Sequence, residues 1–285
     1  MKYKIGIDVG GTFTDFLLAA DDGSSEIFKV LSTPQDPSIG TMGGIALMAQ
    51  SKGLDLPQFL DRVSAIVHGT TVTTNAVLTM RGAKTGLVTT PGVRDALEMR
   101  RGIREEQYNN RYRNVEPVVP RYLRRPVGGR LDYAGAEIAP FSEDDLRAAC
   151  RLFGQEGVEA VAICFMNSFA NPEHEERAAA LVAELMPGAY VSVSTRVLPS
   201  IRFYDRVSTT ALNAFVGPIL RRYLTSLLHK LEEARFGGVL LIMQSSGGVI
   251  SPQAAQDKAA ATLLSGPAGG PVAASPTARC WAKPT

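Results

Sequence analysis

Few cysteines, no long apolar run and little net charge characterise this sequence, and each shortage excludes a class of protein. The three cysteines, Cys150, Cys164 and Cys280, are scattered, without the spacing of a zinc site or a paired disulfide framework. Cys150 and Cys164 fall in apolar periodic segments and are predicted to be inert core thiols. No apolar run is long enough to span a membrane, and the N-terminus enters a strand without a signal-peptide pattern. We therefore expect a cytoplasmic protein with no membrane contact.

Charge is nearly balanced, at a formal net value of +2 from 30 basic and 28 acidic residues. Such a balance requires neither a nucleic acid nor a membrane surface as a partner. Region 100–130 is different, because nine arginines are interleaved with three tyrosines there. Basic residues with aromatics can mark RNA binding, but Glu105, Glu106 and Glu116 dilute the charge and three prolines break regular structure. We predict an extended excursion that contacts a partner subunit or an anionic substrate.

The segment that opens the chain is the most informative one. Apolar residues alternate with small or polar ones over residues 5–9, which predicts a strand with one apolar face. Gly10 and Gly11 are predicted to supply the two positive-φ positions of a tight hairpin turn. Residues 12–18 then return as a second strand.

This turn brings together groups that suit the phosphate tail of a nucleotide. The Asp8 carboxylate suits a hydrated Mg²⁺, while the amides at Gly10 and Gly11 suit phosphate oxygens. The hydroxyls of Thr12 and Thr14 suit the same oxygens. An ordinary surface hairpin with a Gly-Gly turn is the alternative. Asp followed by Gly-Gly-Thr-x-Thr-Asp is richer than such a turn requires, so we favour phosphate binding.

A second polar motif follows the apolar strand predicted at 63–67. It begins at His68, and its threonines lie where a helix is predicted to start. Their hydroxyls and the free N–H groups of that helix could grip an anion or a polar substrate. Plain N-capping is the alternative, with His68 a satisfied polar residue at a strand end. For His68 both interpretations stay open.

The rest of the pattern is that of an α/β protein. Ile39, Met42, Ile45, Leu47 and Met48 are predicted to face the core from the first long helix. Further elements are predicted from apolar period and turn residues: strands at 26–31, 84–90, 160–165 and 239–243, a hairpin at 130–138, and helices at 38–52, 143–156, from 172 onward and within 201–233. Three hairpin-like strands thus precede alternating strands and helices, an order that fits neither a doubly wound Rossmann domain nor a barrel.

Seven ordered stretches carry a family resemblance over nearly the whole chain. They are GIDVGGTFTD (6–15), HGTTVTTNAVL (68–78), GVRDALEMRRG (92–102), AVAICFMNSFANPEHE (160–175), DRVSTTALNAFVGP (205–218), IMQSSGGV (242–249) and TLLSGPAGG (262–270). In these stretches the chain resembles the N-terminal part of the hydantoinase A/5-oxoprolinase family, which includes acetophenone and acetone carboxylase subunits.

The resemblance implies an α/β, ribonuclease-H-like fold of the actin-like ATPase superfamily, in which two halves surround a nucleotide cleft. It implies ATP and Mg²⁺ as cofactors. Asp8 would position the metal and take part in catalysis. The phosphates would be cradled by residues of the opening turn, namely Gly10, Gly11, Thr12 and Thr14.

The resemblance also implies the chemistry and the partners. ATP would activate the carbonyl of a cyclic amide by phosphorylation for hydrolysis; in the carboxylase branch, an enolisable ketone and bicarbonate take the phosphate instead. His68 would be a catalytic residue, and Thr70, Thr71 and Asn75 candidates on the substrate side. A hydantoinase B-type subunit is the expected partner in a heteromeric oligomer.

The last third of the chain departs from that family pattern. We predict a ribonuclease-H-like domain at 1–195 and, at 196–285, the beginning of a second, hydantoinase A-type lobe. Residues 265–270 resemble the segment that leads to a second Asp-x-Gly-Gly-Thr phosphate loop, which this sequence lacks. We therefore expect an incomplete second lobe, truncated before that loop, whose strand at 239–243 lacks neighbours. A split subunit, a shortened sequence or a product altered near its end would explain this, and ATP binding by the chain alone should then be weak.

The first function hypothesis is thus the nucleotide-binding subunit of an ATP-dependent hydantoinase or oxoprolinase. A ketone carboxylase subunit and a non-catalytic, truncated assembly subunit are the alternatives. A sugar-kinase-like phosphotransferase would share the opening hairpin, but the ordered stretches argue against it. The substrate itself cannot be read from these residues, because no catalytic nucleophile stands out.

Overall fold

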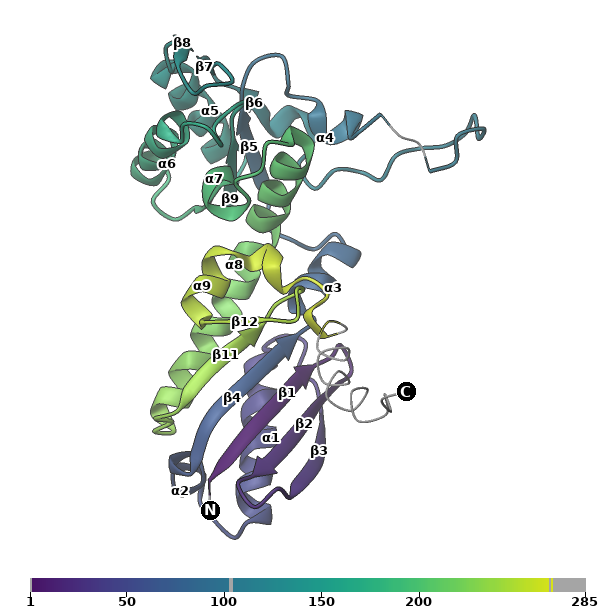
Figure 1. The fold of residues 1–285 in the computed structure, drawn as a ribbon, viewed down its shortest axis with the longest axis vertical. Helices are drawn as coiled ribbons and strands as arrows, with labels where there is room; N and C mark the ends of the chain where they lie inside the picture. The colour runs from purple at the N-terminus through teal and green to yellow at the C-terminus, as the bar shows by residue number, and fades with distance from the viewer. Residues whose placement is uncertain (1, 103–104, 267, 269–285) are drawn as a thin grey trace, which may run out of the picture. The chain divides into compact units, whose positions relative to one another are not determined.

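The computed structural model describes residues 2–102, 105–266 and 268, and the chain divides into two compact units (Figure 1). Unit 1 combines Met1–Arg81 with Ile219–Thr285, and unit 2 is Gly82–Pro218. Unit 2 is therefore inserted between the two parts of unit 1. Arg104 and Cys280, with the predictions for residues 269–270 and 274–285, lie outside the described residues.

A six-stranded sheet forms the centre of unit 1 in the described part of the chain, with the order β12-β11-β4-β1-β2-β3. Its strands are β1 (Tyr3–Val9), β2 (Phe13–Ala20), β3 (Ser25–Leu31), β4 (Val63–Thr70), β11 (Val239–Met243) and β12 (Val249–Ile250). The first three form an antiparallel meander, as predicted, and β4 and β11 run parallel to β1. The carboxyl ends of β1 and β4 therefore meet at one edge of the sheet.

Helices cover one face of this sheet (Figure 1). They are α1 (Pro37–Ser51) and the second half of α8 (Phe203–Glu233), and the shorter helices of unit 1 are α2 (Leu56–Asp61), α3 (Val72–Leu78), α9 (Pro252–Asp257) and a 3₁₀ turn at Ala259–Thr262. Ile5, Ile7 and Val9 of β1 are buried on the covered face. Asp8 and Leu17 project from the opposite face, where both side chains are exposed.

Helix α1 forms where predicted, but it does not bury all of the predicted residues. Ile39 and Leu47 are 55% and 42% exposed, whereas Ile45 and Met48 are fully buried. The helix packs closely because Gly44 faces the ring of Phe16: a Cβ on Gly44 would lie 2.1 Å from Phe16 Cζ. The helix face that packs on the sheet includes Gly44, and a glycine does not count as apolar in a hydrophobic pattern. The pattern of apolar residues therefore predicted the wrong buried face for part of this helix.

The prediction that strand 239–243 lacks neighbours is wrong. This strand is β11, which pairs with β4 in parallel and with β12 in antiparallel register. The order of the strands in the sequence does not show that β11 adds to the sheet formed by the first 70 residues. The predicted domain boundary between residues 195 and 196 stays a prediction.

Unit 2 has a parallel sheet with the order β10-β9-β5-β6 and a small β7–β8 hairpin, among the residues described. Its strands are β5 (Thr85–Thr89), β6 (Arg124–Pro126), β7 (Arg130–Leu131), β8 (Glu137–Ala139), β9 (Ala160–Cys164) and β10 (Tyr190–Val193); its helices are α4 (Ala96–Met99), a 3₁₀ turn at Arg121–Leu123, α5 (Glu143–Gln155), α6 (Glu173–Leu185), α7 (Ser194–Val197) and the first half of α8. Strand β9 is buried along its whole length, as its continuous apolar sequence predicted. Cys150 and Cys164 are buried core thiols, and burial raises the pKa of Cys164 to about 12.

A fully buried ion pair lies beyond the carboxyl end of β9. Arg206 of α8 and Glu175 of α6 are 3.6 Å apart and completely enclosed. Ser168 and Ser194 donate hydrogen bonds to Glu175 Oε1, both at 2.6 Å. Burying such a charge pair is tolerated only when hydrogen bonds satisfy the remaining oxygens and protons. The network therefore joins several elements of unit 2 around one point.

One negative finding concerns membranes. Among the helices within the described residues, none combines the length and the apolar character that crossing a bilayer requires.

Candidate functional site

The β1–β2 turn forms where predicted, but its glycines serve a different purpose. Neither Gly10 nor Gly11 has a positive φ. Gly10 N–H donates to Phe13 O at 3.0 Å, and a Cβ on Gly10 would lie only 2.8 Å from that oxygen. Gly10 is needed because the turn closes tightly on itself, and not because of a left-handed backbone.

Hydroxyl groups hold the turn from within. Thr14 is buried, and its Oγ1 lies 3.0 Å from Ser32 Oγ, which donates to Gly10 O at 2.8 Å. Thr14 is therefore part of the support of the turn. The backbone N–H groups of Gly11 and Thr12 donate no hydrogen bond to any described residue, and both residues are exposed. These two amides are the donors that the turn offers to an anion.

Asp8 lies on the open face of the sheet, directly opposite Asp15 of β2. Its carboxylate is flanked by two glycines: a Cβ on Gly69 would be 3.4 Å from Asp8 Oδ1, and one on Gly266 would be 3.3 Å from it. Partial desolvation raises the pKa of Asp8, and the negative charge of Asp15 raises it further. Asp15 also pairs with Lys29 at 2.8 Å. Asp8 and Asp15 line a cavity of about 540 Å³ on this face.

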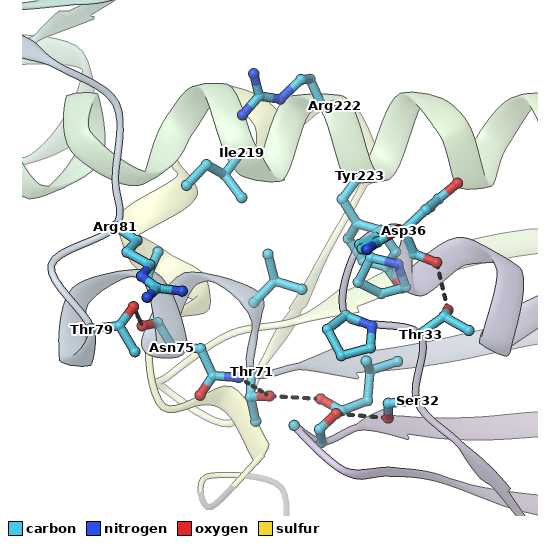
Figure 2. A pocket seen from close by; sticks show the side chains of 18 of the residues that line it. Ser32, Thr33, Asp36, Thr71, Asn75, Thr79, Arg81, Ile219, Arg222 and Tyr223 are labelled. Carbon is cyan, nitrogen blue, oxygen red and sulfur yellow. Dashed lines mark hydrogen bonds between the residues drawn. The ribbon is translucent and has the colours of Figure 1, made fainter.

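A second cavity, of about 720 Å³, connects the two polar motifs of the sequence (Figure 2). We call it the α8 cavity because helix α8 forms one of its walls. Gly10 and Gly11 line it from the β1–β2 turn, and Thr71 and Asn75 line it from the start of α3. The structure thus brings together these four predicted residues, while Asp8, Thr12, Thr14, His68 and Thr70 do not line this cavity.

The polar wall at α3 is built by a short chain of hydrogen bonds, drawn as dashed lines in Figure 2. Thr71 Oγ1 donates to Val9 O at 2.9 Å and accepts from Asn75 Nδ2 at 3.3 Å. Asn75 Oδ1 has no hydrogen-bond partner among the described residues. Because Thr71 already donates to Val9, the amide orientation of Asn75 is fixed, with Oδ1 left available as an acceptor.

His68 and Thr70 are both buried completely. His68 Nε2 lies 2.5 Å from the hydroxyl of Tyr223, and burial lowers the pKa of His68 to about 4. His68 is therefore neutral at pH 7 and lies behind Tyr223, whose side chain lines the α8 cavity. Thr70 Oγ1 accepts a hydrogen bond from Val72 N–H at 3.2 Å. In this structure His68 has the geometry of a residue that supports Tyr223, and its predicted catalytic role stays a prediction.

The sequence reasoning missed most of the lining residues, among them Arg81, Arg222 and Tyr223. Tyr223 belongs to the apolar stripe of α8 and was taken for core. Arg81 and Arg222 form no ion pair with any residue that the structure describes. Figure 2 shows Arg222 directed away from Thr71, whereas Arg81 lies on the wall that carries Thr79 and Asn75. Arg81 could have been predicted to line the site, because it follows the motif at 68–78 by only three residues.

Comparisons with known proteins identify the class. The sequence matches the profile of the hydantoinase/oxoprolinase N-terminal region over residues 4–186 and that of hydantoinase/oxoprolinase over residues 206–282. The chain belongs to the hydantoinase/oxoprolinase family. The resemblance inferred from the seven stretches is thereby confirmed.

Individual relatives are similar over most of the chain. Caprolactamase subunit alpha of Pseudomonas jessenii is 38% identical over 274 residues, which are 95% of this chain and 39% of that protein. The crystal structure of ATP-dependent caprolactamase from Pseudomonas jessenii superposes with a TM-score of 0.87 at 38% identity, covering 96% of this chain and 41% of that one. The nucleotide-free structure of acetone carboxylase gives a TM-score of 0.89 at 29% identity, covering 98% and 41%. The chain spans about two fifths of the length of these relatives.

Proposed function

We propose that this chain is the nucleotide-binding part of an ATP-dependent hydrolase of cyclic amides, a hydantoinase/oxoprolinase-type enzyme. The observation that carries the proposal is the β1–β2 turn, where the Asp8 carboxylate and the unpaired amides of Gly11 and Thr12 meet at the end of one strand. The similarity to an ATP-dependent caprolactamase supports the same chemistry.

The strand order of unit 1 supports a ribonuclease-H-like fold of the actin-like ATPase type. An antiparallel meander β3-β2-β1 is continued by β4 and β11, both parallel to β1. This order places the turn after β1 beside the carboxyl end of β4, where open α/β sheets bind ligands. The proposed fold thus accounts for the position of the turn.

The residues present fit ATP and Mg²⁺. The carboxylates of Asp8 and Asp15 face each other across two paired strands, and the flanking Gly69 and Gly266 leave no side chain over Asp8. Mg²⁺ prefers one or two carboxylates together with phosphate oxygens and waters. Asp8 would hold the ion, with Asp15 next to it, and the Gly11 and Thr12 amides would bind phosphate oxygens. Bound there, ATP would supply the phosphoryl group that activates a carbonyl oxygen for attack by water.

Asn75 favours a cyclic amide as the substrate in the α8 cavity. A ring holds its amide cis, so that N–H and C=O point to the same side, and a carboxamide side chain can pair with both. Asn75 has a free Oδ1 for the ring N–H and a second Nδ2 proton for the ring carbonyl. A Cβ on Gly11 would lie 3.6 Å from Asn75 Nδ2, so Asn75 adjoins the turn with the free amides. A carbonyl bound by Asn75 is thereby held close to the proposed phosphate site.

A ketone carboxylase subunit is the second candidate. The structural similarity to acetone carboxylase favours it, with a TM-score of 0.89. A ketone has no N–H, so it would leave Asn75 Oδ1 without a donor on binding. The cyclic amide therefore fits this wall better. A third candidate, an assembly subunit without catalysis, would bind no substrate in the α8 cavity.

The test uses the protein alone and together with a B-type subunit, which we propose as its partner in a cytoplasmic hetero-oligomer. ε-Caprolactam, 5-oxoproline, and acetone with bicarbonate are each offered with ATP and Mg²⁺, and ADP and organic products are measured. We expect ATP-dependent ring opening of a cyclic amide and its loss in Asp8→Asn. A lactam labelled with ¹⁸O in its carbonyl should deliver the label to inorganic phosphate. Bicarbonate-dependent turnover of acetone would instead identify the carboxylase, and ATP hydrolysis with neither product would contradict both.

A further inference from the structure

Three of the four threonines in the motif at 68–78 form hydrogen bonds to a remote part of the chain, and the fourth, Thr71, lines the α8 cavity. None of Thr70, Thr73 and Thr74 lines either cavity. Each instead makes a hydrogen bond to the segment at 262–265, which lies about 190 residues further along the chain. The three bonds are Thr73 Oγ1 to Thr262 Oγ1 at 3.0 Å, Leu264 N–H to Thr74 Oγ1 at 2.9 Å, and Ser265 Oγ to Thr70 O at 3.2 Å.

The donors and acceptors of these bonds can be assigned, and one bond involves a residue with an unfavourable backbone angle. Thr262 Oγ1 donates to Ala259 O at 2.8 Å, so Thr73 must be the donor in the bond between the two hydroxyls. Leu264 has a φ of +58°, an unfavourable value for a residue with a branched side chain. The N–H of Leu264 donates the hydrogen bond that Thr74 Oγ1 accepts. The bond to Thr74 therefore stabilises a strained residue next to the site.

The segment at 262–266, which these bonds hold, contacts the Asp8 carboxylate through Gly266. Beyond Ser265, the backbone of Gly266 lies so close that a Cβ there would be 3.3 Å from Asp8 Oδ1 and 3.6 Å from Oδ2. On the other side, the backbone of Gly69 lies at the same carboxylate, with the matching distance of 3.4 Å. Asp8 is thus bordered by two stretches of bare backbone, one on β4 and one on the segment at 262–266.

We propose that the three hydrogen bonds form a threonine latch, which fixes the segment at 262–266 against α3 and makes Gly266 a positioning residue for the Asp8 carboxylate. The inference rests on the proposed function, in which Asp8 holds a divalent cation. A carboxylate on an open sheet face can take several rotamers, and a cation site loses affinity when its ligand is not held in place. The latch fixes one wall beside Asp8, and glycine at position 266 keeps that wall thin enough for a hydrated ion.

The experiment measures the site through a paramagnetic cation, Mn²⁺, added to the isotopically labelled chain without ATP. Broadening of the Asp8 and Gly69 amide signals reports cation binding, and hydrogen exchange of the Leu264 amide reports the latch. Gly266→Ala adds a methyl group 3.3 Å from Asp8 Oδ1, and Thr74→Val removes only the acceptor of the Leu264 N–H. The matched controls are Gly43→Ala, where nothing lies within 4 Å of the new Cβ, and Thr225→Val on an exposed face of α8.

We expect Gly266→Ala to weaken Mn²⁺ binding about tenfold or more. Thr74→Val should speed exchange at Leu264 and weaken binding severalfold, and both controls should bind as the unaltered chain does. Faster exchange in Thr74→Val with unchanged Mn²⁺ affinity, or unchanged affinity in Gly266→Ala, would overturn the positioning role while leaving the proposed function intact. Asp8→Asn separates the two ideas: if the chain binds Mn²⁺ equally well without that carboxylate, the cation site and the proposal built on it both fail.

Discussion

A buried histidine couples the protonation state of this protein to its stability. His68 is completely enclosed and hydrogen-bonded to Tyr223, and burial lowers its pKa from 6.5 to about 4. In the unfolded chain His68 takes up a proton near pH 6.5, whereas in the folded chain it resists until about pH 4. The stabilisation is therefore complete above pH 6.5 and is lost as the pH falls through that window, by about 3 kcal/mol in total.

Urea unfolding of the parent and of His68→Gln at pH 7 and pH 5 measures this effect. The free energy of unfolding of the parent should fall more between the two pH values than that of the variant, because a glutamine side chain cannot take up a proton. His229→Gln is the control, since His229 is an exposed residue of α8 and 69% of its side chain is accessible. Equal pH dependence in the parent and His68→Gln would contradict the prediction.

At the residue scale, the sequence predicted part of the group of residues that lines the α8 cavity. Gly11 and Asn75 share the α8 cavity, as their motif positions suggested. Thr14 and Thr70 were expected to contact ligands, yet both are buried and bonded within the chain. The identity of a threonine in the sequence is the same whether its hydroxyl binds a phosphate or another group of its own chain. The neighbours that the fold supplies, Ser32 for Thr14 and the N–H of Val72 for Thr70, decide between these roles.

At the scale of elements, packing of α1 on β2 depends on one missing side chain. Gly44→Ala would place a methyl group 2.1 Å from the ring of Phe16, which is 2% exposed. We expect a loss of about 1–3 kcal/mol from overpacking, even though alanine favours the helix. Its neighbour Gly43 is exposed with open space around it, so Gly43→Ala should stabilise the protein by up to about 1 kcal/mol. Opposite signs in urea denaturation are the expected result, and Gly44→Ala combined with Phe16→Leu should recover part of the loss.

Element types were predictable where local signals agreed with the fold. Strand β9 is an unbroken apolar run, and α5 follows the N-cap residue Ser142, whose Oγ accepts a hydrogen bond from Asp145 N–H. Strand β6 (Arg124–Pro126) was missed because two arginines and a proline do not look like a strand. It forms because it pairs with β5 in parallel. Non-local pairing of this kind leaves no periodic signal in the sequence.

At the scale of the whole molecule, unit 2 should fold without unit 1. It is continuous in sequence, has its own apolar core and contains both members of the buried ion pair of Glu175 and Arg206. We expect residues 82–218 to show a cooperative thermal transition by circular dichroism. Arg206→Met should destabilise this fragment by about 3–5 kcal/mol, because Glu175 would remain as a buried charge. A fragment without a cooperative transition would show that unit 2 depends on the rest of the chain.

The insertion of unit 2 also delays the pairing of two strands during synthesis of the chain. Strand β4 is complete at Thr70, but its neighbour β11 starts at Val239, about 170 residues later. A ribosome needs roughly ten to thirty seconds for that distance, and domains generally fold as they emerge. During this interval the inserted unit can fold, while the edge of β4 that later pairs with β11 remains unpaired. An unpaired strand edge can form hydrogen bonds with strands of other chains. Residues 3–70 are therefore made before unit 2, but the sheet that they form gains β11 only after unit 2 has been made. The time for which the edge of β4 stays exposed to aggregation depends on how quickly translation proceeds through the insertion.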